Sequence, residues 1–252
     1  MTEVATENRT VTIDAAGAYY RDLNAQIREL ASNGVEKIEL RNVAGQRYIG
    51  TNLSKSLAID IYGTPGNDLG AFMNGSRITV YGNAQDGCGN TMNSGEIIIH
   101  GHAGDVIGLS ARGGKIFVKE SVGYRAGIHM KEYQDQRPVL VIGGAAQDFI
   151  GEYMAGGILI MLGLEGKDHY KARFIGTGMH GGVIYIRGTV EPHQVGKEVG
   201  IAEANGKDWP TLEAYIREFA GHFGYNAGEI LKGKFIKLTP RWLRPYGHIY
   251  AH

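Results

Sequence analysis

A short pattern of glycine, apolar and β-branched positions recurs through the middle of the chain, between residues 45 and 190. Each copy starts with a glycine, carries a Met or a similar residue three positions later, and passes through small residues into a β-branched run. Such runs are typical of strands, and the interval between copies leaves no room for a helix. The opening glycines are Gly50, Gly70, Gly89, Gly108, Gly127, Gly151 and Gly176.

The spacing of these glycines predicts a repeat architecture. The interval is 19 residues three times between Gly70 and Gly127, and it lengthens to 24 and then 25 residues afterwards. Self-similarity at a period of this length indicates stacked units that cannot bury an apolar face singly. A strand–turn–strand unit fits one coil of a parallel β-helix. We therefore predict a mainly β fold, a single-stranded parallel β-helix of about seven turns over residues 37–190.

Residue types within the repeat support this interpretation. Glycine suits the corners, where the chain needs positive φ angles and close backbone approach. Met fills irregular gaps in a core, so Met on one phase predicts a stack inside the coil. Five of the seven methionines occupy the position three residues after an opening glycine: Met73, Met92, Met130, Met154 and Met179.

Residues 1–36 are predicted to form an N-terminal arm and a capping helix. The stretch 17–33 is amphipathic, with apolar residues spaced by three and four, and Gly34 provides a helix stop. Short strands are predicted on either side, at 11–13 and 37–43. The open end of a β-helix exposes backbone and core, so a cap is needed there.

Residues 191–252 form a third predicted region, because the period is lost after Gly188. A connector leads into a second amphipathic helix at 210–222, in which Pro210 suits the first turn. The chain then becomes aromatic and basic from Arg241 to His252. A tail of this kind can dock on a neighbouring subunit or on its own rod, and the sequence leaves both open.

Two insertions interrupt the later repeats, at 129–138 and 164–175. Both are rich in charged residues and tyrosine. Insertions in repeat proteins tend to gather on one face, often the face that binds partners. They are the best sequence candidates for partner contact, with solvated loops as the plain alternative.

Candidate chemistry is sparse. GTGMHG at 176–181 matches a dinucleotide fingerprint in letters, but it lies in phase with the repeat and precedes a predicted strand, whereas that fingerprint needs a helix. His100 and His102 would share a face if their strand continues, yet two histidines alone do not make a metal site. His129, beside Lys131 and Glu132, forms a polar cluster without a nucleophile or a paired base.

Four aspartates recur just before the opening glycines of four repeats. Stacked carboxylates repel one another unless a cation or backbone N–H groups bind them. Aspartate is common in tight turns, so turn capping is favoured over a calcium site. The four are Asp68, Asp86, Asp105 and Asp148.

Composition limits the partners. Lys plus Arg number 26, as do Asp plus Glu, so the net charge is zero and a nucleic-acid partner is not expected. The single Cys88 gives neither an intramolecular disulfide nor an iron–sulfur pattern, and it fits a reducing compartment. The chain has no apolar stretch long enough for a membrane span and no signal-like N-terminus, so we predict a cytoplasmic protein without a membrane partner.

The repeat resembles a known family. Residues 66–108, 151–163 and 176–188 are similar to the glycine-rich repeat at the C-terminus of the glutamate synthase large subunit, the GXGXG repeat or alpha subunit domain 3. The resemblance covers roughly residues 37–190, and seven copies keep phase. The short chain and its N-terminal helix resemble the stand-alone version of that domain.

This resemblance implies a right-handed β-helix that packs between catalytic domains and supplies no catalytic residue. The chain would then be a non-catalytic scaffold subunit of a glutamate-synthase-like oxidoreductase. Its implied partners are a glutamine-amidotransferase-like subunit and an FMN-binding glutamate-synthase-like subunit. FMN, iron–sulfur clusters and possibly FAD would lie on those partners, so no catalytic, cofactor-binding or metal-binding residue is expected in this chain.

Two alternatives stay open at the level of sequence. A similar repeat occurs in the C subunit of formylmethanofuran dehydrogenase, which would give a scaffold with different redox partners. A carbohydrate-active enzyme built on a β-helix is the less favoured alternative, because such enzymes need a groove of clustered Asp, Lys or Arg, and no such cluster repeats here. Fold alone does not decide between them.

Overall fold

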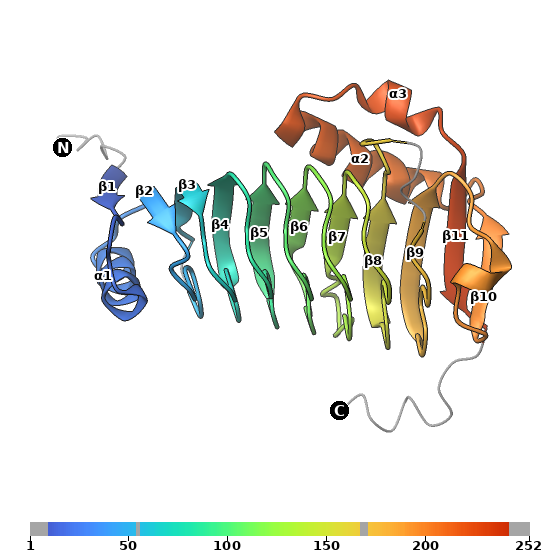
Figure 1. Cartoon of the computed structure of the whole chain (residues 1–252), viewed down its shortest axis with the longest axis horizontal. Coiled ribbons are helices and arrows are strands. Elements are labelled where there is room, and N and C mark those ends of the chain that lie inside the picture. The colour runs from blue at the N-terminus through green and yellow to red at the C-terminus, as the bar shows by residue number, and fades with distance from the viewer. Residues whose placement is uncertain (1–9, 54–55, 167–170, 242–252) are drawn as a thin grey trace, which may run out of the picture.

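The computed structural model describes residues 10–53, 56–166 and 171–241, and shows an elongated rod with helices at both ends (Figure 1). One 11-stranded sheet runs its whole length, in the order β1-β2-β3-β4-β5-β6-β7-β8-β9-β11-β10. The strands are β1 (Thr10–Asp14), β2 (Lys37–Ala44), β3 (Ala58–Thr64), β4 (Asn74–Tyr81), β5 (Ser94–Ile99), β6 (Lys115–Val118), β7 (Val139–Ile142), β8 (Ala155–Met161), β9 (Gly181–Arg187), β10 (Val199–Glu203) and β11 (Phe235–Pro240).

The predicted parallel coil is confirmed. Strands β1 to β9 pair in parallel in chain order, one strand from each repeat. The solenoid makes about six turns, not seven. The reason is geometric, because seven glycine corners enclose six complete turns and the chain leaves the coil after the last of them.

Two columns of apolar side chains, mostly β-branched or leucine, fill the interior. Each member pairs with its equivalent on the next strand, and all are buried. The five methionines predicted to stack inside are also buried, each at most 2% exposed. One column consists of Ile38, Ile59, Ile78, Ile97, Ile116, Leu140, Leu159 and Ile184.

At the corners, residues other than glycine also adopt positive φ angles. Gly151 has φ of +63°, as expected for a glycine corner, but Phe149 and Tyr153 on either side have φ of +69° and +52°. A bulky residue in this left-handed region is uncommon, because its Cβ crowds the carbonyl. Rung-to-rung hydrogen bonds hold it there: Phe149 N–H donates to Arg173 O at 2.9 Å, and Tyr153 N–H to Thr177 O at 2.8 Å.

Helix α1 (Tyr20–Ser32) closes the N-terminal end, close to the predicted 17–33. It buries Leu23 and Ile27 against the first rungs of the interior core. The buried amide of Asn24 donates to Arg47 O at 2.8 Å, which ties the helix to the chain entering the first corner. The predicted strands beside it are β1 and β2. Residues 1–9 of the predicted arm lie outside the described residues.

Two helices fold back over the outside of the rod, which the sequence did not predict. Helix α2 (Trp209–Phe223), predicted as 210–222, and the short α3 (Ala227–Leu231) lie over the C-terminal half of the rod, where α2 crosses successive strands (Figure 1). A second apolar cluster forms beneath them, in which Phe117 of β6 and Phe219 of α2 are fully buried. Strands such as β7 are therefore buried on both faces.

The C-terminal end of the coil is closed by antiparallel strands. Strand β11 inserts between β9 and β10 and pairs antiparallel with both. The predicted connector therefore contains a strand, β10, and a short 3-10 helix, η1 (Pro192–Gln194). Antiparallel closure ends the stacking of parallel rungs. The basic aromatic tail beyond Arg241 lies outside the described residues.

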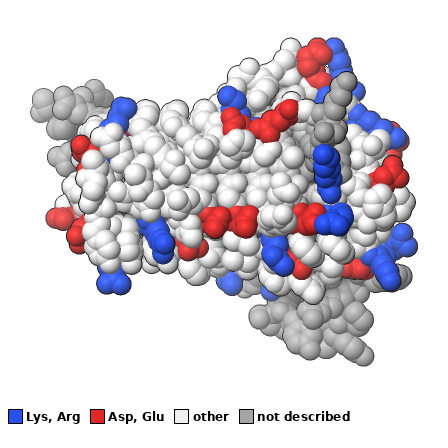
Figure 2. Space-filling model, viewed as in Figure 1, with Lys and Arg blue, Asp and Glu red and all other residues white. Residues whose placement is uncertain are grey.

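Charged side chains of both signs are interspersed over the face shown in Figure 2. Several form pairs between neighbouring rungs, such as Lys37 with Asp60 at 2.9 Å and Arg77 with Glu96 at 3.2 Å. This distribution agrees with the zero net charge.

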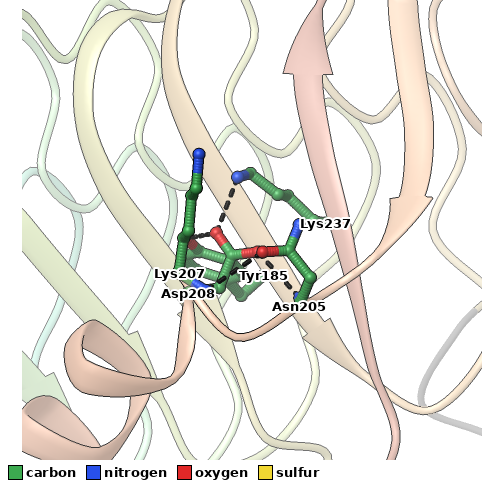
Figure 3. Close-up of polar contacts among 5 residues, drawn as sticks. All are labelled: Tyr185, Asn205, Lys207, Asp208 and Lys237. Atoms are coloured by element: carbon green, nitrogen blue, oxygen red, sulfur yellow. Dashed lines mark hydrogen bonds and ion pairs between the residues drawn. The ribbon is translucent and has the colours of Figure 1, made fainter.

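A buried polar group fastens α2 to the closing strands (Figure 3). The Tyr185 hydroxyl on β9 donates to Asp208 Oδ1 at 2.8 Å, and Lys237 Nζ on β11 lies 2.6 Å from the same oxygen. Burial would raise the pKa of Asp208, but the Asn205 N–H and the Lys237 and Tyr185 donors outweigh it, so the pKa is lowered. Burial and the adjacent carboxylate raise the pKa of Tyr185.

Candidate functional site: a polar pocket and an aromatic corner

The two histidines considered for a metal site do not converge. Strand β5 ends at Ile99, so the alternation that would have aligned them stops before His100. His100 stacks on Tyr81 with ring centroids 5.0 Å apart, and burial lowers its pKa. His102 Nε2 instead lies 2.9 Å from Glu120 Oε2.

The polar cluster at the start of the 129–138 insertion separates into three different roles. The His129 ring is exposed and stacks on Tyr153. Glu132 accepts a hydrogen bond from Gly157 N–H at 2.9 Å and pairs with Arg137 at 2.9 Å. Lys131 lines a pocket. Glu132 therefore ties the insertion to the rod, while Lys131 faces the pocket.

GTGMHG at 176–181 is a solenoid corner, as its phase in the repeat predicted. Gly176 and Gly178 have φ of +67° and +72°, and the strand β9 follows directly. Gly178 leaves room for a neighbouring ring, since a Cβ there would lie 2.4 Å from Tyr153 Cδ1. No helix N-terminus follows these residues, so they lack the element that binds pyrophosphate in a dinucleotide site.

Three of the four recurring aspartates cap backbone groups, as the favoured interpretation predicted. Asp86 Oδ1 accepts from Asp105 N–H, and Asp105 Oδ1 from Tyr124 N–H, both at 2.8 Å. Asp148 accepts from Arg173 N–H at 2.8 Å. Each capped N–H lies one rung further along the rod, so these carboxylates join successive turns. Asp68 differs, because it accepts from the Asn90 side chain at 3.0 Å.

Two other groups of potential metal ligands occur among the described residues. His102, Glu120 and Glu165 place one ligand atom each within 4.8 Å of the others, and so do Glu96, Glu218 and His222. In the second group Arg77 and Lys115 already pair with the two glutamates. In the first, Glu165 accepts from the Ser121 hydroxyl. Ion pairs and hydrogen bonds already engage the glutamates of both groups.

A pocket of about 430 Å³ lies on the rod at the N-terminal ends of strands β4 to β7. One wall is a column of polar side chains, one from each of four successive rungs, at the position after the buried Met phase. The other wall is the 129–138 insertion, which the sequence had singled out. The pocket is lined by Asn74, Asn93, Arg112, Lys131, Tyr133 and Gln136.

The four column residues, called the polar ladder (Asn74, Asn93, Arg112 and Lys131), are held in register by their own backbone. Arg112 N–H donates to Met92 O at 2.8 Å, and Lys131 N–H donates to Ala111 O at 2.9 Å. Asn93 N–H and Asn74 N–H bond the preceding rung in the same way. The side chains therefore stack about 4.8 Å apart along the rod.

A rigid hairpin forms the opposing wall. Tyr133 N–H donates to Gln136 O at 3.1 Å, and Gln136 N–H donates to Tyr133 O at 3.0 Å. The pocket is therefore built from regular backbone on both sides, although its side chains reach solvent. Every lining side chain carries a hydrogen-bond donor, and none is a carboxylate.

Beside the pocket, the last rungs expose a set of aromatic and basic side chains that we call the aromatic corner: Arg125, His129, Phe149, Tyr153 and Phe174. Phe149 stacks on Phe174 at 4.9 Å, and the Arg125 guanidinium lies 4.9 Å from the Phe149 ring. Tyr153 and Phe174 are each 48% exposed. All five have positive φ, so the corner backbone directs them outward as a group.

Sequence reasoning missed both features, although it named their parts. To predict the pocket, one would have to know that the insertion folds over the rung before it. A signal was present, because Asn74, Asn93, Arg112 and Lys131 all follow the Met phase directly. The aromatic corner carried a similar signal two residues before and after each opening glycine.

Among the described residues, no helix has both the length and the apolar character needed to cross a membrane. A model of the GXGXG motif family matches residues 26–244. An uncharacterized protein of Methanocaldococcus jannaschii is 49% identical over 251 residues, and the match covers 96% of each chain. Both matches take in the solenoid together with its C-terminal cap.

Proposed function

The chain belongs to the GXGXG motif family, and from that premise we propose that it is a non-catalytic structural subunit of a glutamate-synthase-like multi-subunit oxidoreductase. Its role is to hold the catalytic chains in a fixed arrangement. The partners are a glutamine-amidotransferase-like subunit and an FMN-binding glutamate-synthase-like subunit. FMN, iron–sulfur clusters and FAD, where the complex uses it, belong to those partners.

The use of recurring polar residues supports this role. The aspartates at the corners cap the next rung, and Glu132 ties the insertion to Gly157 N–H. The buried Asp208 joins three elements of the C-terminal cap. These groups make the rod rigid. A rigid rod with a family relationship to a multi-domain oxidoreductase is suited to positioning other chains.

The aromatic corner is the surface on which we expect a partner subunit to dock. Tyrosine, phenylalanine and arginine are residue types that concentrate binding energy at interfaces when they become desolvated. Here Tyr153 and Phe174 are each 48% exposed, and the Tyr153 N–H is held by a hydrogen bond to Thr177 O on the next rung. A partner would therefore meet a preorganised apolar surface and would lose little conformational entropy in ordering it.

Purification of the tagged chain from its native host tests the proposal. Mass spectrometry of the chains that elute with it should identify an amidotransferase-like and an FMN-binding subunit, and the eluate should show a flavin absorption spectrum. The variant Tyr153→Asn should recover less of both partners, because it removes an exposed ring from the aromatic corner.

Phe72→Asn provides the matched control. Phe72 is 50% exposed with φ of +56° and occupies the same place in the repeat as Tyr153, at the other end of the rod. It should recover partners like the wild type. A monodisperse chain without partners, or a different set of redox chains, would overturn the proposal.

A further inference from the structure

The pocket is lined by two positively charged side chains and no carboxylate. Arg112 and Lys131 occupy adjacent rungs, and within the described part of the chain neither forms an ion pair with a carboxylate. Several other basic residues of the rod do so. Arg125 pairs with Glu152 at 3.0 Å, and Lys37 pairs with Asp60 at 2.9 Å. Two unpaired like charges on neighbouring rungs repel each other unless an anion lies between them.

Neither acidic residue of the insertion, Glu132 or Asp135, lines the pocket or forms an ion pair with Arg112 or Lys131. Glu132 follows Lys131 in the chain, but one of its oxygens binds Gly157 N–H and Arg137. The remaining lining groups are donors or amides. The Asn74 carbonyl oxygen already accepts the Ser94 hydroxyl at 2.6 Å, so its NH₂ group is the part available to a ligand.

From this geometry we infer that the pocket binds a small organic dianion, a molecule that carries two carboxylate groups or a phosphate. Its volume of about 430 Å³ lies in the range of small-molecule sites. Arg112 and Lys131 bind the charged groups, with Arg112 suited to a bidentate contact. The amides and the Tyr133 hydroxyl bind the remaining oxygens. The inference does not depend on the proposed scaffold role.

Calorimetric titration of the full chain at low ionic strength tests this inference. The probes are succinate as a dicarboxylate, glycerol 3-phosphate as a phosphate ester, and succinamide as the neutral counterpart of succinate. A dianion should bind saturably and more weakly as salt is added. The stronger of the two dianions identifies the ligand class, and succinamide should not bind.

The double variant Arg112→Gln/Lys131→Gln should weaken binding about tenfold or more, because it removes both charged donors. Lys37→Gln/Arg41→Gln is the matched control, since it removes one lysine and one arginine that are paired with Asp60 and Glu39. That control should bind like the wild type. Absence of binding by both dianions, equal binding of succinamide, or unchanged affinity of the pocket variant would overturn the inference.

Discussion

One outward-facing column of side chains runs along the whole sheet, and its two halves differ sharply. In the N-terminal half the column consists of Glu39, Asp60 and Thr79, with the two carboxylates paired to Arg41 and Lys37. In the C-terminal half the same register positions are apolar and lie beneath α2: Ile98, Phe117, Val141 and Ile160.

The inner columns show no such change, since they are apolar and buried from end to end. The repeat therefore specifies the coil, while the outer positions decide what lies against it. The C-terminal half carries the docked helices, the insertion that forms one wall of the pocket, and the aromatic corner. The comparison shows that one backbone can give a solvated half and a half that is specialised for contacts.

The largest difference between the halves is expected for truncations in the outer column. Phe117→Ala should lower the free energy of unfolding by about 4 kcal/mol, because it leaves a cavity between the sheet and α2. Glu39→Ala should cost far less, because its ion pair with Arg41 is solvated. Chemical denaturation followed by circular dichroism measures both. Similar costs for the two variants would remove the distinction between the halves.

Glycine substitutions test a property in which the two halves should not differ. We expect the backbones of neighbouring rungs to approach each other equally closely in both halves. A Cβ at Gly63 would lie 2.1 Å from Val43 O, and one at Gly181 would lie 2.2 Å from Ala155 O. Gly63→Ala and Gly181→Ala should each cost about 3 kcal/mol, because a backbone atom must move. Gly206→Ala, which meets nothing within 4 Å, is the control. A cost confined to one end of the rod would contradict a uniform coil.

The buried group around Asp208 distinguishes the C-terminal cap by its pH dependence. Asp208→Asn should cost about 2 kcal/mol at neutral pH, since it leaves Lys237, 28% exposed, without its carboxylate. The folded-state pKa of Asp208 is lowered, so its stabilisation is present above the unfolded pKa and is lost as pH falls through the folded one.

Unfolding curves at neutral and acidic pH measure this effect, and the variant should lack the part of the acid-induced loss that Asp208 causes. Glu203→Gln is a suitable control, because Glu203 pairs with Lys234 on the exposed surface. An equal acid dependence in wild type and Asp208→Asn would contradict the assignment.

The smallest effect is expected at the strained corners. Phe72→Asn should raise the free energy of unfolding by about 0.5 kcal/mol, because Asn tolerates the left-handed backbone better than Phe. Tyr153→Asn should gain less, because it also loses the stacking with His129. Thermal unfolding measures both. A loss of stability in Phe72→Asn would show that the corner backbone is not strained.

The sequence predicted the coil, its glycine corners, the buried Met stack and both main helices, because each follows from local periodicity. It did not predict that β11 inserts between β9 and β10, since that pairing joins segments far apart in the chain. It also missed the cover formed by α2. The signal was present in the outer column, where alternation at residues 59–61 gives way to unbroken apolar runs at 97–99 and 139–142.

The candidate sites were predictable only in part for a related reason. The insertion and the residues after the Met phase were visible, but the pocket arises from how the insertion folds over earlier rungs. The places of Phe149, Tyr153 and Phe174 two residues from an opening glycine were also visible, but their positive φ was not predictable, because aromatic residues do not normally indicate it.

Hydrogen exchange of the chain, alone and in the complex recovered from its host, tests the scaffold role most directly. We expect slower exchange in the complex at residues 123–129, 149–153 and 173–178, where a docked partner would cover the aromatic corner. Residues 37–44 and the amides beneath α2 should be unchanged. Slower exchange confined to 37–44, with none at the aromatic corner, would contradict it.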